Sequence, residues 1–100
     1  MPKAATTKRE MDVRKQAAAF GQAIYQLRIK AALSQEELAF RGRIGRNYIS
    51  VLERGEKEPC LGVIFRLSKA LNASMLDIFG LAEQLYKEGY KPVSRRARVR

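Results

Sequence analysis

The stretch from Ser34 to Glu58 constrains the fold most, because it reads as two short helices joined by a tight turn. Ser34 is a preferred N-cap residue, and Glu37 three positions later completes the S-x-x-E pattern of a capping box. Gly42 is expected to end the first helix, because glycine tolerates the left-handed backbone that a sharp turn requires. The sequence therefore predicts a helix that begins after Ser34 and stops at Gly42.

The second helix of this stretch is defined by residues at its two ends. Gly45 is an acceptable N-cap, and Gly55 is placed to stop the helix as the residue after its C-cap. Ile44 is the apolar residue of the turn, and Ile49 and Leu52 lie three positions apart, so they share the inward face. The opposite face near the helix start is expected to carry Arg46, Asn47, Ser50 and Val51.

These two helices resemble the helix-turn-helix of the phage-repressor and Cro type, also called the xenobiotic-response-element family. The family pattern is matched without a gap across the motif, and with the flanking helices the similarity covers about residues 20–79. The resemblance implies an all-α, five-helix fold like that of the lambda repressor, with the second helix of the motif in the major groove of DNA. The matching residues are Leu33, Ser34, Gln35, Glu36, Glu37, Leu38, Ala39, Ile44, Tyr48, Ile49, Ser50, Leu52, Glu53, Arg54, Gly55 and Pro59.

The chain departs from the family pattern around the turn. Arg43 stands where the family has its turn glycine, and Gly42 comes one residue earlier. Gly45 replaces the serine that usually caps the second helix, and Cys60 stands where relatives often have a capping serine. For Cys60, an inert small side chain and a redox-sensitive thiol are both open interpretations. The departures affect the expected geometry of the turn and not the identity of the motif.

Apolar residues at helical spacing extend on both sides of the motif. A long first helix is predicted from about Met11 to near Ala32, and a fourth helix over about residues 60–71. Asn72 suits the left-handed conformation that often follows a helix end. The expected inward residues are Val13, Ala17, Phe20, Ile24, Leu27 and Ala31 in the first helix, and Leu61, Ile64, Leu67 and Leu71 in the fourth.

A fifth helix is predicted after Ser74, which forms a second capping-box pattern with Asp77. Gly80 lies inside this helix, where glycine costs about 1 kcal/mol relative to alanine. The helix carries more apolar side chains than one small core can cover, and exposed apolar patches usually mark a contact surface. We therefore expect a homodimer. The apolar side comprises Ile78, Phe79, Ala82, Leu85 and Tyr86.

Positive charge is concentrated at the two ends of the chain. The net charge is +10, of which residues 1–15 contribute +3 and residues 87–100 contribute +5. A basic chain attracts polyanions such as nucleic acid, although a solvated tail that aids solubility is an equally open interpretation. The predicted organisation is a basic arm at 1–12, a helix-turn-helix domain at 13–88 with the motif at about 34–54, and a basic tail at 89–100.

Composition excludes several other classes of protein. Hydrophobic residues make up 46% of the chain, which suits a folded domain, and no apolar run approaches the roughly 18 residues of a membrane helix. The N-terminus lacks the apolar segment of a signal peptide, and one cysteine fits a reducing compartment, so a cytoplasmic location in a bacterial, plasmid or phage system is expected. The chain has no histidine, and neither metal-site spacing nor a Ser-His or Cys-His nucleophile is found, so no enzyme activity, metal or cofactor is expected. No small-molecule ligand is expected either, because the sequence offers no room for a ligand-sensing domain.

The candidate base-reading residues lie at the start of the second motif helix. Arg46 can donate two parallel hydrogen bonds to guanine, and Asn47 can pair with the edge of adenine. The resemblance implies that these two residues read bases, with Ser50 and Val51 one turn further on. The alternative is that Arg46 and Asn47 belong to an ordinary polar helix surface.

Other residues are expected to contact the DNA backbone or to hold the motif together. The resemblance implies that Gln35 touches a phosphate, and the free N–H groups of the helix start there favour an anion. For Tyr48 the alternative to a backbone contact is that it only shields the core, and for Arg43 it is a solvated side chain without a DNA contact. Arg28 and Glu53 match a pair that forms a salt bridge in relatives and would tie the first helix to the second motif helix. The expected backbone contacts are Gln35, Arg43, Tyr48, Arg54 and Lys57.

The leading hypothesis is a sequence-specific regulator of transcription that binds double-stranded DNA, as a dimer on a palindromic operator. An antitoxin that neutralises a protein partner and autoregulates its operon is the main alternative. A third hypothesis is sequence-independent nucleic-acid binding through the basic ends, which predicts an affinity that falls steeply with salt.

Overall fold

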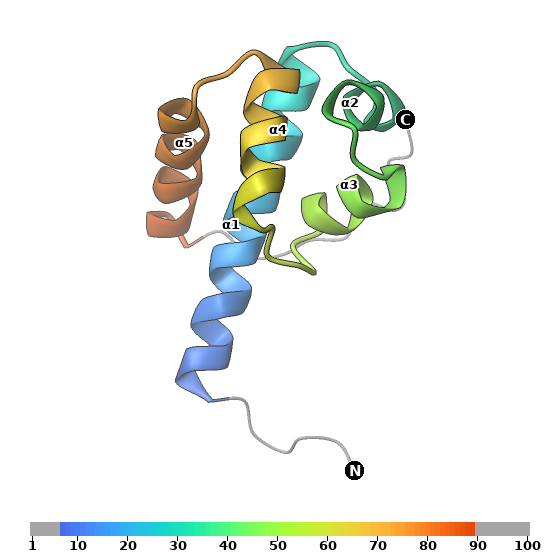
Figure 1. Ribbon diagram of the computed structural model, residues 1–100. Coiled ribbons are helices and arrows are strands. Elements are labelled where there is room, and N and C mark those ends of the chain that lie inside the picture. Colours follow the sequence, from blue (N-terminus) through green and yellow to red (C-terminus); the bar gives the residue numbers. More distant parts are fainter. Residues whose placement is uncertain (1–6, 90–100) are drawn as a thin grey trace.

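Five α-helices make up the described part of the chain, residues 7–89 of the computed structural model (Figure 1). This confirms the predicted all-α, five-helix architecture. No helix among these residues is long and apolar enough to span a membrane. The rest of the predicted arm and tail, residues 1–6 and 90–100, lies outside the described residues. The helices are α1 (Lys8–Lys30), α2 (Gln35–Gly42), α3 (Arg46–Glu53), α4 (Leu61–Leu71) and α5 (Met75–Lys87).

The first helix begins at Lys8, before the predicted start near Met11, so residues 8–12 are helical and not part of an extended arm. Thr7 Oγ1 accepts a hydrogen bond from the Glu10 N–H at 3.1 Å, and Glu10 Oε1 accepts one from the Thr7 N–H at 3.0 Å. This capping box satisfies two donors that a helix start leaves unpaired. The earlier helix start follows from the local T-x-x-E pattern of Thr7 and Glu10, which apolar periodicity does not reveal.

The same helix ends at Lys30, two residues before the predicted end near Ala32, because Ala32 adopts a left-handed backbone with φ 61°. The N–H groups of Ala32 and Leu33 donate to the carbonyl oxygens of Ile29 and Arg28, at 2.9 and 3.1 Å. This Schellman arrangement reverses the chain into α2. Alanine at this position gives no sequence signal for the stop, since glycine is the usual residue there.

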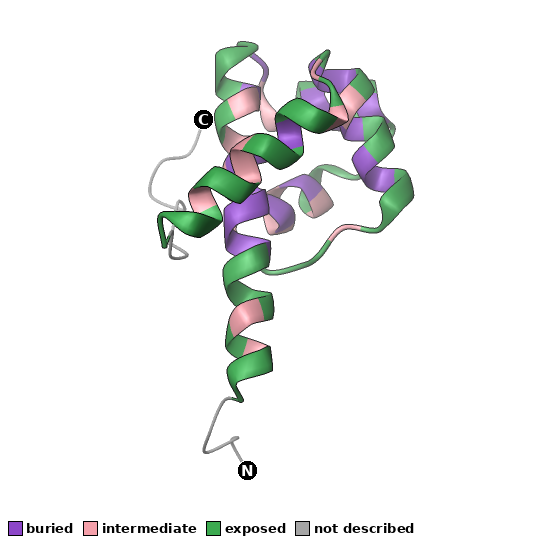
Figure 2. Cartoon of the chain, turned by 90° about the vertical axis from the view of Figure 1, so that its left-hand side faces the viewer, coloured by how far each residue is buried: buried purple, intermediate pink, exposed green. Residues whose placement is uncertain are grey.

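The core is built from buried side chains of all five helices. α1 and α4 stand at the centre, with α2 and α3 on one side and α5 on the other (Figure 1). The buried residues of α1 lie between Ala17 and Arg28, whereas its first turns are largely exposed and project beyond the body (Figure 2). The large side chains that are fully buried are Ile24, Leu38, Ile49, Leu52, Leu67 and Ile78.

Two glycines allow α1 and α3 to approach closely. A Cβ atom at Gly21 would collide with the carbonyl oxygen of Leu52 and would lie 3.1 Å from that of Glu53. Gly55 follows α3 with φ 75°, and a Cβ there would lie 2.7 Å from the Cα atom of Ala18. The backbone of α1 therefore fixes the C-terminal end of α3 directly.

The inward stripe of α4 differs from the predicted one at its first member. Leu61 is 64% exposed, and Val63 is buried instead. With about 3.6 residues per turn, a stripe centred on Leu67 includes Val63 but places Leu61 well to one side. Asn72 follows the helix with φ 54°, which confirms the predicted left-handed C-cap.

The last helix packs mainly on α1 and leaves much of its apolar surface uncovered. Ser74 Oγ accepts a hydrogen bond from the Asp77 N–H at 3.0 Å, but the reciprocal half of the predicted capping box is missing. Aspartate is one methylene shorter than the glutamate of a full capping box. Ile78 is the one buried residue of α5, and Phe79 pairs with Phe20 at a ring-centroid distance of 6.1 Å.

Candidate nucleic-acid interface

The start of α2 is fixed by the predicted capping box. Ser34 Oγ accepts a hydrogen bond from the Glu37 N–H at 3.0 Å, and Glu37 Oε1 accepts one from the Ser34 N–H at 2.8 Å. The Ser34 backbone N–H, followed by its side chain, lowers the pKa of the Glu37 carboxyl, since both bonds favour its charged form. Leu38 and Ala39 are buried, so α2 is capped at one end and anchored on its inner face.

The turn between α2 and α3 differs from the prediction by one residue. Gly42 is the last residue of α2, and Arg43 adopts the left-handed conformation with φ 55°. Gly42 is buried, and a Cβ there would lie 3.0 Å from Ile44 Cδ1 and 3.6 Å from Ala70 Cβ. Gly42 is therefore needed for close packing, and the residue that adopts the strained left-handed backbone is Arg43. Ile44 is buried beneath the turn, as predicted.

Both ends of α3 match the sequence prediction. Gly45 is its N-cap, without a side-chain hydrogen bond, and the N–H groups of Gly55 and Glu56 donate to the carbonyls of Leu52 and Val51 at 2.9 and 3.1 Å. These two bonds form a Schellman motif at the C-terminal end. Ile49 and Leu52 are fully buried. α3 is thus anchored along one face, which leaves the other free.

The four expected base-reading residues lie on or beside that free face. Arg46 and Asn47 are exposed at the start of the helix, whereas Ser50 and Val51 are half-buried. Arg54 Nη1 donates a hydrogen bond to Ser50 Oγ, so this hydroxyl already has a partner. Arg46 and Asn47 are therefore the most accessible of the four.

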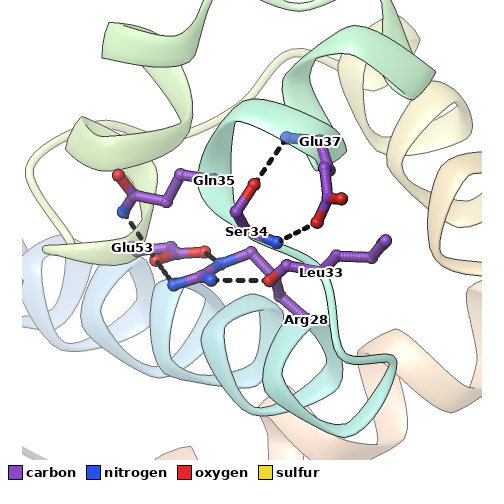
Figure 3. Close-up of polar contacts among 6 residues, drawn as sticks. All are labelled: Arg28, Leu33, Ser34, Gln35, Glu37 and Glu53. Atoms are coloured by element: carbon purple, nitrogen blue, oxygen red, sulfur yellow. Dashed lines mark hydrogen bonds and ion pairs between the residues drawn. The ribbon is translucent and has the colours of Figure 1, made fainter. Parts of the chain in front are cut away.

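A buried ion pair joins α1 to the end of α3 (Figure 3). Arg28 Nε donates to Glu53 Oε2 at 2.6 Å, and Arg28 Nη2 donates to Glu53 Oε1 at 3.0 Å. Arg28 Nη1 donates to the carbonyl of Leu33 at 2.9 Å, and its guanidinium lies 5.4 Å from the ring centre of Tyr25. The pair implied by the resemblance is present, with both hydrogen bonds of a bidentate contact.

The network extends to the start of α2 through Gln35. Gln35 Nε2 donates to Glu53 Oε1 at 3.0 Å, so α1, α2 and α3 meet at one carboxylate (Figure 3). Glu53 sits at the negative end of the α3 dipole and accepts from two different side chains. The sequence predicts a phosphate contact for Gln35 but gives no signal for this internal hydrogen bond. The side-chain amide of Gln35 uses one N–H as the donor to Glu53, and its oxygen can act only as an acceptor.

The remaining expected backbone contacts differ in accessibility. Arg43 and Lys57 are exposed, whereas Tyr48 is half-buried and packs against the core. Arg54 Nε donates to Glu56 Oε2 at 2.9 Å, and this contact raises the pKa of Arg54. Cys60 is exposed and is the N-cap of α4 without a side-chain hydrogen bond. Arg66 and Lys69 are two exposed cations of α4 that share a surface hollow with Arg43, and no motif in the sequence points to them.

A capped helix, a turn closed by a buried isoleucine, and a second helix with one anchored and one free face define a DNA-binding helix-turn-helix module. The family model described as "Helix-turn-helix" matches residues 24–78, more than half of the chain. The chain therefore belongs to the helix-turn-helix family and is a DNA-binding regulator of transcription.

Named relatives agree with this assignment. The control protein C.BamHI of Bacillus amyloliquefaciens is 43% identical over 60 residues, which cover 59% of this chain and 74% of that protein. The restriction-modification controller protein C.AhdI of Aeromonas hydrophila superposes with a TM-score of 0.62 at 36% identity, covering 63% of this chain and 96% of that one. The clp gene regulator ClgR of Corynebacterium glutamicum superposes with a TM-score of 0.71 at 30% identity, covering 74% and 79%.

Proposed function

We propose that this regulator acts as a homodimer on a palindromic operator, with α3 of each copy in the major groove. The observation that carries the proposal is the contrast between the two faces of α3. Ile49 and Leu52 are fully buried, while Arg46 and Asn47 are exposed at the helix start. Side chains at this end of a recognition helix meet base edges, and arginine and asparagine suit guanine and adenine.

The rigid connection of α3 to the body supports this role. The Arg28–Glu53 pair, the Gln35–Glu53 hydrogen bond and the close approach at Gly21 all hold the C-terminal half of the helix. A base-reading side chain needs a fixed support, because discrimination depends on hydrogen bonds formed at one geometry. Lys57 and Arg43 are exposed on either side of α3 in the chain and can bind phosphates.

The apolar surface of α5 supports the dimer. Leu76 is 85% exposed, Phe79 44% and Tyr86 38%. These residues line a hollow of about 710 Å³ between α5, α1 and the loop before α4. Patches of this kind on a small domain usually mark a protein contact. A two-fold dimer would set the recognition helices about 34 Å apart, which is one turn of DNA.

The restriction-modification controller protein C.AhdI among the relatives supports a further part of the proposal, control of such a system. The test of operator binding is selection of bound sequences from a random DNA pool. We expect an enriched palindrome with half-sites one helical turn apart. Enrichment of no sequence at all would contradict it and would favour binding through charge alone.

The dimer is tested by sedimentation at micromolar concentration. Leu76→Lys is expected to give a folded monomer, because it places a charge in the apolar contact. Phe40→Lys is the matched control, since Phe40 is equally exposed, at 86%, but lies on α2. It should leave the dimer intact. A wild-type protein that sediments as a monomer, both free and on DNA, would rule out the dimer.

A further inference from the structure

A hollow lined by basic side chains lies beside the turn of the helix-turn-helix motif. It is an open hollow of about 730 Å³ between the C-terminal ends of α2 and α4. The buried residues Gly42 and Ala70 contribute to its lining. Its other lining residues are Arg41, Arg43, Arg66, Lys69 and Asn72.

Four of the lining residues are cations and none is an acid. Within residues 7–89, none of the four forms an ion pair, and all four are exposed. Glu37 interacts through charge with Arg41 one turn later on α2, but its carboxylate is hydrogen-bonded to Ser34 at the other end of the helix. Like charges gathered around one hollow repel each other, and a bound anion would relieve that repulsion.

Helix dipoles account for only part of this cluster. Arg41 and Lys69 lie in the last turns of α2 and α4, where a cation offsets the negative end of the dipole. Arg66 lies one turn earlier on α4, and Arg43 lies beyond the end of α2 in a left-handed conformation that is unfavourable for arginine. An anion that bridges the two helix ends accounts for all four residues together.

The hollow is continuous with the expected DNA surface through Arg43. The chain passes from Arg43 through Ile44 and Gly45 directly to Arg46 at the start of α3. We infer that this hollow binds phosphates of the DNA backbone outside the base pairs that α3 reads. This inference rests on the proposed DNA binding and adds a second, sequence-independent contact to it.

The test varies single phosphates at constant DNA length. On the selected operator, individual phosphates flanking each half-site are replaced by neutral methylphosphonates, and affinity is measured for the wild type and for Arg66→Gln/Lys69→Gln. Both changes lie on the exposed side of α4 and put a good helix former in place of the cation. Arg14→Gln/Lys15→Gln is the matched control, because it removes the same charge from the exposed start of α1.

We expect the effect of neutralising one or two flanking phosphates on affinity to depend on Arg66 and Lys69. Neutralising those phosphates should weaken the wild type and the control variant about equally, but should barely affect Arg66→Gln/Lys69→Gln. That variant should also lower the slope of log affinity against log salt by about 1 to 2, or roughly 0.9 for each phosphate lost. Its preference among base pairs should be unchanged.

Two results would overturn the inference. One is the absence of any flanking phosphate whose effect depends on Arg66 and Lys69. The other is binding of inorganic tripolyphosphate to the wild type but not to the variant, without coupling to flanking phosphates, which would make the hollow a site for a free phosphate compound. Either result leaves the base preference of the wild type intact, whereas failure of the proposed function would remove that preference.

Discussion

Arg28 on α1 and Glu53 at the end of α3 form a buried ion pair in which two guanidinium nitrogens bond the two carboxylate oxygens, at 2.6 and 3.0 Å. Both side chains are at least nine-tenths buried. The pair links the recognition helix to the longest helix of the domain. Because both charged groups are shielded from water, each one needs the opposite charge of the other to offset the cost of its burial.

Arg28→Ala should therefore destabilise the domain by about 3–5 kcal/mol, since it leaves the charge of the buried Glu53 carboxylate without the guanidinium that offsets it. Urea unfolding measures this difference. Lys30→Ala, two residues later on the exposed end of α1, is the control and should change stability by less than about 0.5 kcal/mol. A cost below about 1 kcal/mol for Arg28→Ala would mean that the pair does not hold α3.

Gly21→Ala tests the close approach of α1 and α3. The added Cβ would collide with the backbone oxygen of Leu52, which cannot move without shifting α3. We expect a loss of about 3 kcal/mol or more, at the upper end for overpacking. Gly62→Ala in α4 has nothing within 4 Å of the new atom and should be neutral or stabilising by up to about 1 kcal/mol. Similar unfolding midpoints for the two variants would disprove the close contact.

Arg43→Gly separates stability from DNA binding at the turn. Arg43 is left-handed with φ 55°, a conformation that costs an L-residue about 1–2 kcal/mol. Glycine removes this strain but adds entropy to the unfolded chain, so a net gain of up to about 1 kcal/mol is expected. The same change removes a cation beside α3, so affinity for DNA should fall while thermal stability rises. Parallel losses of both would contradict this reading of the turn.

The Glu37 carboxyl should make the stabilising effect of the α2 capping box depend on pH. Its carboxyl has a lowered pKa in the folded protein, so its stabilising effect is present above the ordinary value of 4.5 and is lost as pH falls through the folded value. Glu37→Gln keeps a side chain that can complete the capping box but does not titrate. The stability difference between wild type and variant, measured by urea unfolding, should be constant near neutral pH and should change below about pH 4.5. A pH-independent difference would argue against the capping role.

Local signals explain what the sequence predicts well. The capping box of Ser34 and Glu37, the stop at Gly55 and the C-cap at Asn72 each depend on residues within one turn of each other. Such contacts are set by side-chain type and spacing, so they are readable without tertiary structure. The inward positions of Ile49 and Leu52 follow from helical spacing in the same way.

Tertiary contacts explain what the sequence could not predict. The left-handed residue is Arg43 and not Gly42, because Gly42 is held against Ile44 and Ala70, and Ala70 is distant in sequence. Gln35 bonds Glu53 through the packing of α2 on α3, which no local pattern reveals. The basic hollow depends on the meeting of two helix ends, one inside the motif and one that follows it in the chain.

On the operator, we propose that Arg46 reads a base while Lys57 binds the DNA backbone. Binding titrations on the selected operator and its single-base variants, at several salt concentrations, test it most directly. Arg46→Ala should cost about 1–3 kcal/mol on the preferred site and relax the choice at one base pair of each half-site. Lys57→Ala should weaken all sequences about equally and lower the salt slope by about 1. If Arg46→Ala keeps the full base preference, α3 does not read the sequence in this way.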